Sequence, residues 1–432
     1  MSGGACEDEQ TDGETLPMNG DPSTSDEAVE EEMLDTVFGR EGIVERKGVI
    51  DAGGLKSSFA PWHHPVKQIV RDYQWCDLAK KLLEENRPED ERKNLRYFTL
   101  PGADLLDVRA LSQRLSELKT SIEYFGFDAG YGENTEELEE ARAVYRATEA
   151  TLRQGGFISD NAQILPDRLE DIALAGSQAD SQLQQQDIFD VINIDACDHL
   201  GYLPPGRSKS MFDAIERLLA HQVPAEKPWL LFVTTRVDPE LMGAPAERIQ
   251  GAISDNLRLH SSAFGQPLAD CIGGKVETLA TNITECWSVP SLNLMKIFSI
   301  GLAKYIMQFF YAQHNHPASV ELISSYCYKV HGELPDMLAL AFRIHPRGLK
   351  IHKATANGVS VIAPLELTGA LKIVARAKKV WDLDDALKTN KEVLDDAVSG
   401  TSQLLAGANY DLEKWRDWLA GLAVRPIALK ET

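Results

Sequence analysis

Short apolar runs and helical segments alternate between residues 96 and 237. Five runs rich in β-branched, aromatic and leucine residues predict buried strands, and each is followed by a segment with helical spacing of its apolar positions. The expected strands cover residues 96–100, 122–128, 162–165, 189–197 and 229–237. The helices expected after the first four strands cover residues 104–118, 134–153, 169–175 and 210–221. A further helix is expected at 65–85, before the first strand. Because such apolar strands are buried on both faces, the pattern predicts a parallel sheet with helices on either side.

The pattern changes after residue 237. Residues 239–289 predict a helical insertion, and a long apolar helix is expected at 291–312. The runs "SVELISSYCYKV" and "DMLALAFRIHP" then enclose the turn-forming "HGELP", which is a hairpin signal. We therefore expect five parallel strands closed by an antiparallel pair.

Composition separates the two ends of the chain from this α/β region. Residues 1–38 hold twelve Asp and Glu and neither Lys nor Arg, which predicts a disordered acidic tail or a short segment that folds on a protein partner. Residues 39–348 are expected to form the α/β domain. Residues 349–432 are expected to form a small helical C-terminal module.

Charge limits the partners of the chain. The 432 residues carry a formal charge of −22, which argues against a non-specific grip on nucleic-acid backbones. One segment has the opposite sign, because residues 343–379 hold eight Lys and Arg and the single acid Glu366. This segment is either a solvated helix face or a surface for nucleic acid.

Several classes of protein are not indicated. No apolar run reaches membrane-spanning length, so no membrane contact is expected. The six cysteines lie far apart without a CxxC pair, which favours reduced thiols in a cytoplasm over a disulfide framework. No group of Cys, His and Asp has metal-ligand spacing, so no metal is expected.

Three stretches carry candidate chemistry at the carboxyl ends of the expected strands, where open α/β sheets bind ligands. They are "TLPGADL" after the first strand, "YFGFD" ending the second, and "NIDACD" ending the fourth. With these stretches and the terminal hairpin, residues 60–346 resemble class I S-adenosylmethionine-dependent methyltransferases. The resemblance implies a Rossmann-like sheet in the order 3-2-1-4-5-7-6, with an antiparallel seventh strand.

The resemblance also implies roles for individual residues. Asp128 would hold the ribose hydroxyls of S-adenosylmethionine, and Asp167, after the third strand, would contact its adenine. Asn193 and Asp195 would lie beside the reacting methyl group, with Asp195 orienting the accepting atom.

The turn after the first strand departs from the family pattern, acid-x-Gly-x-Gly-x-Gly. Gly102 keeps one position where the backbone can approach a cofactor closely. Pro101 removes a backbone donor and stiffens the turn, and Asp104 can cap the following helix. Two interpretations follow: Pro101 and Gly102 shape a divergent methionine pocket, or the fold is retained for another purpose.

The segment "APWHHPVKQIVRDYQW" precedes the first strand, and in the resembling family such a leading helix often lies over the cofactor cleft. His63 or His64 could act as a general base, since imidazole titrates near neutrality, or could simply pack the helix. Lys67 and Arg71 share one helix face and could bind the substrate.

Arg236, at the end of the fifth strand, is a further candidate. Its guanidinium could hold an anionic substrate group, or could form an ion pair with Asp238 or Asp195.

Two hypotheses for function remain open. The first is an S-adenosylmethionine-dependent methyltransferase that acts on a large substrate. The second is a catalytically silent methyltransferase-like scaffold that binds protein or nucleic acid. A nucleotide-using dehydrogenase is disfavoured, because its three-glycine fingerprint is missing and the terminal hairpin would be unexplained.

Overall fold

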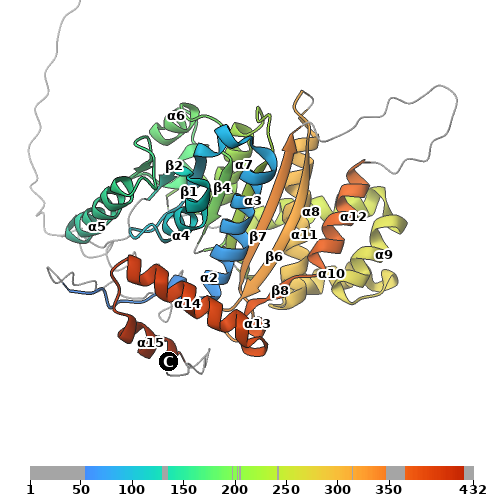
Figure 1. Cartoon of the computed structure of the whole chain (residues 1–432). Coiled ribbons are helices and arrows are strands. Elements are labelled where there is room, and N and C mark those ends of the chain that lie inside the picture. Colours follow the sequence, from blue (N-terminus) through green and yellow to red (C-terminus); the bar gives the residue numbers. More distant parts are fainter. Residues whose placement is uncertain are drawn as a thin grey trace, which may run out of the picture. The chain divides into compact units, whose positions relative to one another are not determined.

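The structure of the chain is a computed structural model (Figure 1), which describes residues 54–128, 135–196, 198–201, 203, 206–240, 243–313, 315–346 and 365–422. All of these residues belong to one compact unit, Lys47–Thr432. The predicted acidic tail, residues 1–38, lies outside the described residues, as do residues 347–364 of the basic segment.

An eight-stranded sheet forms the centre of the described unit, in the order β3-β2-β1-β4-β5-β7-β6-β8. Its strands are β1 (Asn94–Thr99), β2 (Ser121–Phe127), β3 (Gln163–Leu165), β4 (Val191–Asp195), β5 (Trp229–Arg236), β6 (Ala318–Tyr328), β7 (Met337–Pro346) and β8 (Trp381–Asp382). Strands β1 to β5 are parallel, and β7 runs antiparallel to both β5 and β6. The predicted order 3-2-1-4-5-7-6 is therefore confirmed, and the unpredicted β8 adds a short strand parallel to β6.

Helices cover both faces of the sheet, as predicted (Figure 1). The core on one face includes residues of α6 (Gln178–Gln184), α7 (Met211–His221), α8 (Gly243–Leu259), α9 (Ser261–Ile272), α10 (Leu279–Ser288), α11 (Leu292–Tyr311) and α12 (Leu365–Ala377). The core on the other includes residues of α2 (Pro65–Ile69), α3 (Asp77–Asn86), α4 (Leu106–Leu115), α5 (Thr135–Gln154), α13 (Leu383–Thr389), α14 (Lys391–Gly407) and α15 (Leu412–Gly421). The boundary predicted at residue 348 falls outside the described residues. The helices that follow it divide between the two cores: α12 packs on β6 in one, whereas in the other α13 packs on β6 and α14 packs on α2 and α4.

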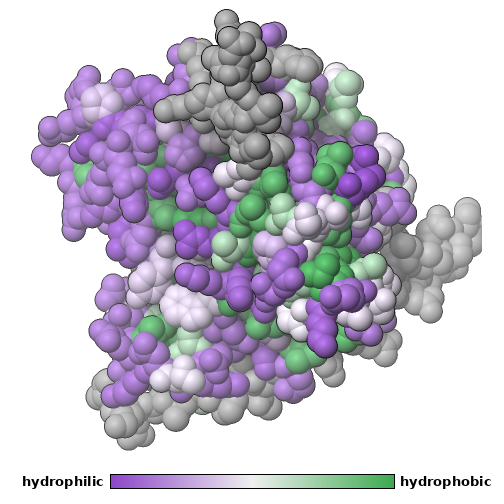
Figure 2. Space-filling view, turned by 90° about the vertical axis from the view of Figure 1, so that its right-hand side faces the viewer, coloured by the Kyte–Doolittle hydropathy of each residue, from purple (hydrophilic) through white to green (hydrophobic). Residues whose placement is uncertain are grey.

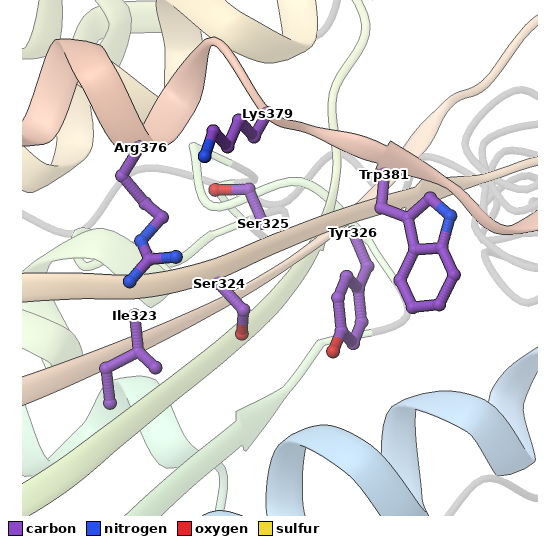
Figure 3. Close-up of a pocket in the computed structure, with 7 residues that line it drawn as sticks. All are labelled: Ile323, Ser324, Ser325, Tyr326, Arg376, Lys379 and Trp381. Atoms are coloured by element: carbon purple, nitrogen blue, oxygen red, sulfur yellow. The ribbon is translucent and has the colours of Figure 1, made fainter.

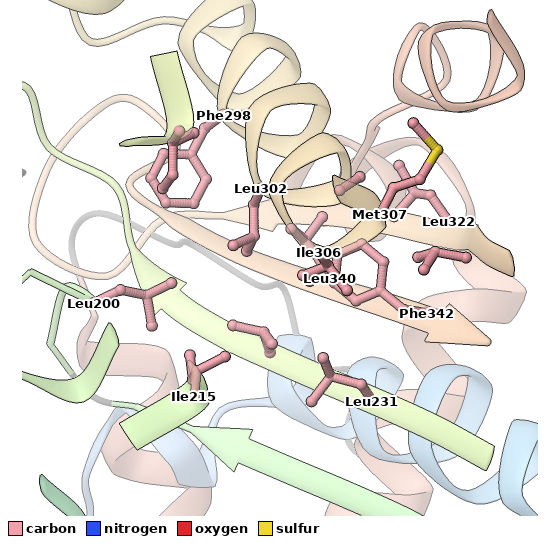
Figure 4. Packing of buried hydrophobic residues seen from close by; sticks show 14 of the residues in the cluster. Leu200, Ile215, Leu231, Phe298, Leu302, Ile306, Met307, Leu322, Leu340 and Phe342 are labelled. Carbon is pink, nitrogen blue, oxygen red and sulfur yellow. The ribbon is translucent and has the colours of Figure 1, made fainter. Parts of the chain in front are cut away.

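Side-chain alternation along the central strands builds the two cores. Along β5, Leu231 and Val233 enter one core, whereas Leu230 and Phe232 enter the other. Figure 4 shows the first core, where Leu231 of β5, Phe342 of β7 and side chains of α11 converge. Burial of both faces explains why these strands are almost entirely apolar in sequence.

Helix α11 is apolar because it is surrounded by the hydrophobic core. Most of its side chains are buried, including Lys304, whose ammonium bonds Asn256 Oδ1 at 2.8 Å and Glu366 Oε1 at 2.7 Å. This buried cation is satisfied by α8 and by the first turn of α12. Among the described residues, no helix has the length and hydrophobicity needed to span a bilayer.

The helix predicted at 65–85 is present, but its middle is unusual. Residues Val70–Cys76 are π-helical between α2 and α3, and the Asp77 amide donates to the Asp72 carbonyl five residues earlier. Short π segments in helices are often found at functional sites. Arg71 and Gln74 of this segment are both buried. The Gln74 amide reaches Ser324 Oγ at 2.8 Å, which ties the segment to β6.

The helical insertion carries scattered apolar surface. Figure 2 shows green and purple surface interspersed on the side where Figure 1 places α9, α10 and α12. Large apolar side chains that are more than a third exposed there include Leu259, Val276, Val289, Leu292 and Leu365. Single exposed apolar residues of this kind are ordinary on soluble proteins.

Candidate functional site at the carboxyl edge of the sheet

The carboxyl ends of β2, β1 and β4 lie side by side and carry the predicted acidic residues. Asp128 directly follows β2, and its amide donates to the Leu165 carbonyl of β3 at 3.0 Å. Asp195 ends β4 and pairs in register with Thr234 of β5. Because these strands are parallel neighbours, Asp128 and Asp195 lie on the same edge, on either side of β1.

The turn between β1 and α4 lies between those two carboxylates. Pro101 is buried, and its ring packs close to Gly126 of β2. A side chain at Gly126 would clash with the Thr99 carbonyl, so glycine is required there for the strands to meet. Gly102 differs, because it is exposed and a Cβ added to it would meet nothing within 4 Å.

The end of this turn stores backbone strain. Leu105 precedes α4 with φ 49° and ψ 43°, a left-handed conformation that is unfavourable for a side chain with a Cβ. Such outliers persist where the surrounding structure fixes them, and they are frequent at ligand sites. Leu105 is fully buried, so packing holds it in this conformation.

The expected helix cap by Asp104 is wrong. Helix α4 begins at Leu106, and no side chain caps its first turn. The Asp104 carboxylate instead forms an ion pair with Lys56 and accepts a 2.6 Å hydrogen bond from the Tyr410 hydroxyl. Asp104 therefore joins the turn to the C-terminal helices, because its partner lies 306 residues further along the chain.

A buried lysine contacts the carboxylate that ends β4. Lys67 of α2 is 5% exposed, and its Nζ lies 2.5 Å from Asp195 Oδ1 and 3.4 Å from the Tyr328 hydroxyl. Nζ also lies 4.8 Å from the centre of the Trp75 ring. Burial alone lowers the pKa of Lys67, but the attraction of Asp195 and Tyr328 outweighs it and raises that pKa. Lys67 is thus held as an ammonium beside Asp195.

Arg71 brings a second buried cation to the same region. Its Nη2 donates to the Trp62 carbonyl at 2.8 Å, whereas Nε and Nη1 are buried without a hydrogen-bond partner among the described residues. Burial lowers the pKa of Arg71, and Asp195 and Asp107 offset part of that effect. Two guanidinium nitrogens, Nε and Nη1, therefore remain to donate to a polar group at this edge.

A chain of hydrogen bonds links β1, β4 and α4 beneath the edge. The Asn193 amide donates to the Tyr97 hydroxyl at 2.8 Å, and that hydroxyl donates to Asp107 Oδ2 at 2.9 Å. Thr99 Oγ1 donates to the same carboxylate oxygen at 2.5 Å. The Asn193 Oδ1 is buried and accepts no hydrogen bond from the described residues.

The site residues expected from the sequence did not include Tyr97, Thr99, Asp107 or Tyr328. One signal was available, since Tyr97 lies in a largely buried strand and a buried phenol needs a polar partner. Asp107, in the first turn of the next helix, supplies that partner. Tyr328 had no such signal, because it reaches Lys67 from β6, 261 residues away.

The two predicted histidines have structural contacts at the start of α2. His63 Nδ1 accepts from the Ala60 amide at 3.0 Å, and His64 Nδ1 accepts from the Val66 amide at 3.2 Å. The His63 ring lies 4.8 Å from that of Tyr410. The packing interpretation of this segment is therefore seen directly, and a general-base role stays a prediction.

Arg236 forms one of the ion pairs considered from the sequence. Its Nη2 lies 3.1 Å from Asp238 Oδ2, and its Nε is buried without a partner in the described part of the chain. Its amide donates to the Asp198 carbonyl at 3.2 Å, so the ladder between β4 and β5 continues to this residue. Burial lowers the pKa of the neighbouring His199, against the opposing effect of Asp198.

Asp167 lies two residues after β3, next to the end of β2. Its Oδ2 is buried and accepts no hydrogen bond from the described residues. The structure therefore places all the residues predicted to bind the cofactor, Pro101, Gly102, Asp128, Asp167 and Asn193, at or just below one edge of the sheet.

The family model described as PP_RS20740-like matches residues 56–420. The chain belongs to the PP_RS20740-like family. The match covers both cores and the C-terminal helices, so α12 to α15 are part of the family's shared architecture. The description of the PP_RS20740-like family names neither an activity nor a ligand. A comparison with curated proteins found no match.

A similarity to a solved structure was also found. That structure is a candidate class I S-adenosylmethionine-dependent methyltransferase from Listeria monocytogenes, with 11% sequence identity and a TM-score of 0.34. The match covers 79% of this chain and 71% of the other. The order and direction of the strands independently give this PP_RS20740-like chain a class I methyltransferase-like fold.

Proposed function

We propose that the chain is an S-adenosylmethionine-dependent methyltransferase that acts on a large substrate. The observation that carries the proposal is the position of Gly102, exposed in the turn between β1 and α4, with Asp128 and Asp195 on the strand ends at either side. Neither a positive φ nor crowding requires glycine at this position. Close approach of a ligand to the backbone supplies a reason for it.

The hydrogen-bond acceptors at this edge fit the cofactor. The Asp128 carboxylate would accept hydrogen bonds from the ribose diol, and Asp167, with its unbonded Oδ2, would face the adenine. Asn193 offers an unbonded carbonyl oxygen below the turn. When bound, S-adenosylmethionine supplies a methyl group that is already activated, so the protein's main task is to position the acceptor.

The buried charges supply that positioning for the acceptor. Lys67 holds Asp195 by a 2.5 Å ion pair, which keeps the carboxylate oriented at the end of β4. The second carboxylate oxygen of Asp195 would accept a hydrogen bond from an N–H or O–H group of the acceptor. Arg71 would donate from Nε or Nη1 to a carbonyl or anionic group of the same molecule.

The cofactor and the acceptor would share this edge. Asp128 follows β2, and Asp195 and Arg236 end β4 and β5, so the order β2-β1-β4-β5 places three strand spacings between Asp128 and Arg236. At about 4.8 Å per spacing, this span is about 14 Å. The cofactor would take the side of Asp128, and the acceptor would lie over Asp195 and Arg236.

Calorimetric titration with S-adenosylmethionine tests the proposal. We expect micromolar-range binding to the full chain that is weakened about tenfold or more by Asp128→Ala, because a hydrogen-bonded charged group contributes about 1.5–3 kcal/mol. Asp187→Ala is the matched control, since Asp187 is an exposed aspartate that precedes β4 at the opposite end of the strand. Lack of binding at millimolar cofactor, with both variants folded, would overturn the proposal.

A scaffold without catalysis is the second candidate, and one observation favours it. Asp195 is already engaged by Lys67, and Tyr97 and Asn193 are already bonded to each other within the protein. Such an arrangement could serve stability alone. It predicts that Asp195→Asn and Lys67→Met change only the stability, with no effect on the binding of cofactor or acceptor.

A further inference from the structure

A hollow of about 340 Å³ lies on the outer side of β6. Four of its lining residues come from β6, and three come from the segment that runs from the last turn of α12 to the beginning of β8. They are Ile323, Ser324, Ser325 and Tyr326, with Arg376, Lys379 and Trp381. The volume is within the range of small-molecule sites, about 300–1,000 Å³. We call this site the β6 hollow.

The β6 hollow exists because β8 covers little of β6. Strand β8 pairs only with Tyr326 and Cys327, so the earlier part of β6 has no strand on that side. The register of β6 also shifts between Leu322 and Ser324. Ser324 and Ser325 follow this shift and pair in regular register with Ala341 and Leu340, so their side chains point to opposite sides of β6 (Figure 3).

One end of the β6 hollow is cationic. Figure 3 shows the Arg376 guanidinium and the Lys379 ammonium on the α12 side, above the strand. Both residues are exposed, and neither forms an ion pair with any residue in the described part of the chain. The charge of Arg376 reaches Glu321. The pKa of Glu321 is lowered mainly by a hydrogen bond to His345, and the positive charges of Arg343 and Arg376 lower it further.

The other end of the β6 hollow is aromatic. Tyr326 and Trp381 form an edge-to-face pair with ring centres 5.6 Å apart, and Trp381 is 43% exposed (Figure 3). An exposed indole beside a charged surface can stack on a planar ligand. The aromatic end therefore adds an element that a simple anion site does not need.

Two serine hydroxyls lie between these ends. Ser325 is 3% exposed, and its Oγ forms no hydrogen bond with any described residue. Ser324 Oγ accepts from Gln74 at 2.8 Å, and the Ser324 hydroxyl also forms a hydrogen bond with Tyr326. A buried hydroxyl without a partner is unfavourable, so a polar group of a ligand in the β6 hollow would stabilise it.

Cations at the end of a helix have a simpler explanation, because they interact favourably with the helix dipole. This accounts for Arg376 in the last turn of α12 and for Lys379 just beyond it. It does not account for the exposed indole or for the unpartnered hydroxyl of Ser325. The convergence of all three features on one hollow points to a ligand with an anionic end and a planar end.

We propose that the β6 hollow binds a nucleotide unit. The phosphate contacts Arg376 and Lys379, the base stacks on Trp381, and the Ser325 hydroxyl bonds the sugar or the base. A free nucleotide and single-stranded nucleic acid share this chemistry. The site is separate from the methyl-transfer site proposed above, so either proposal can fail without the other.

Binding of a fluorescent single-stranded oligothymidylate, and separately of thymidine monophosphate, to the full chain tests this proposal. Trp381→Ala should weaken binding about tenfold, since stacking of one base contributes about 1–3 kcal/mol. Lys379→Gln should weaken it and lower the salt dependence, by about 0.7 in the slope of log K against log salt for each lost phosphate contact. Glu321→Gln should strengthen binding, because it removes a negative charge near Arg376.

Lys372→Gln is the matched control, because Lys372 is an exposed cation of the same helix outside the lining of the β6 hollow. Binding of the monophosphate within about tenfold of the oligonucleotide identifies a free nucleotide, and binding of the oligonucleotide alone identifies a nucleic-acid strand. Equal losses in Lys372→Gln and Lys379→Gln overturn the proposal, as does undiminished binding by Trp381→Ala. Equal competition by polyglutamate also overturns it, because it would show a surface for acidic peptides.

Discussion

The indole Nε1 of Trp415 donates a 3.0 Å hydrogen bond to the backbone carbonyl of His63. Trp415 lies on α15 and is fully buried, whereas His63 precedes the helix that holds Lys67 and Arg71. The adjacent carbonyl, that of Trp62, accepts from Arg71. The C-terminal helices therefore fix the position of the segment that carries the buried cations.

Trp415→Phe should destabilise the protein by about 1–2 kcal/mol, because it leaves the buried His63 carbonyl without its donor. Trp418→Phe on the same helix is the control. Because Trp418 is only half-buried, this substitution should lower the free energy of unfolding less. Urea unfolding followed by circular dichroism measures both. Equal losses for the two variants would show that the hydrogen bond adds nothing beyond ring packing.

The ion pair between Lys67 and Asp195 should respond asymmetrically to mutation. Asp195→Ala leaves a buried ammonium without its counter-charge and should cost about 3–5 kcal/mol. Lys67→Met should cost clearly less, because the Asp195 side chain keeps 27% of its exposure and stays partly hydrated. The free energies of unfolding at pH 7 test this order, and a reversed order would contradict the burial of Lys67.

The same pair predicts a change in the pH dependence of stability. In the wild type the pKa of Lys67 is raised, so its contribution is present below the unfolded value of about 10.4 and is lost only at higher pH. Asp195→Asn removes the main attraction that opposes burial and leaves only that of Tyr328, so we expect burial to lower that pKa below the unfolded value. The stability of this variant relative to wild type should then rise with pH toward 10, by at most about 1.4 kcal/mol per pH unit. A constant difference between pH 7 and pH 9.5 would refute this electrostatic account.

Two glycines should separate ligand binding from folding. Gly126→Ala places a Cβ against the Thr99 carbonyl and should cost about 1–3 kcal/mol of stability. The Cβ added by Gly102→Ala meets open space, so the melting temperature without cofactor should not change. The same Cβ should weaken the binding of S-adenosylmethionine by steric contact. Thermal melts with and without cofactor measure both effects. Unaltered cofactor affinity in Gly102→Ala would place the ligand elsewhere.

The buried thiols should be unreactive in the folded protein. Cys76, Cys271, Cys286 and Cys327 are all free and buried, and burial raises the pKa of Cys271 to about 11. At pH 8 about one molecule in a thousand would carry that thiolate. Iodoacetamide labelling read by peptide mass spectrometry should modify these four residues only after addition of urea. Rapid labelling of Cys271 without urea would show that α9 opens locally.

Much of the fold could be predicted because the relevant patterns are local. The apolar run of β5 and the hairpin of β6 and β7 each lie within one short stretch, and the strand order follows once the methyltransferase-like arrangement is assumed. Strand β8 has only two residues, too few to form a pattern. The π-helical turn at Val70–Cys76 could not be predicted either, because it keeps a nearly helical spacing of apolar positions.

The sequence predicted where the residues of the candidate site lie but not which side chains they contact. Asp128 and Asp195 follow directly from their places at strand ends. The partner of Asp104 is Tyr410 and a partner of Lys67 is Tyr328, and both arise from tertiary packing between distant segments. Asn193 likewise depends on Tyr97 of a neighbouring strand, which becomes evident only when the strand order is known.

A crystal structure of the full chain with S-adenosylhomocysteine tests the central claim most directly. We predict density for the nucleoside over Gly102, with the ribose hydroxyls within hydrogen-bond distance of the Asp128 carboxylate and the sulfur facing Asp195. Density for the nucleoside at another place, or none at saturating ligand, would contradict the assignment of this edge as a methyl-transfer site.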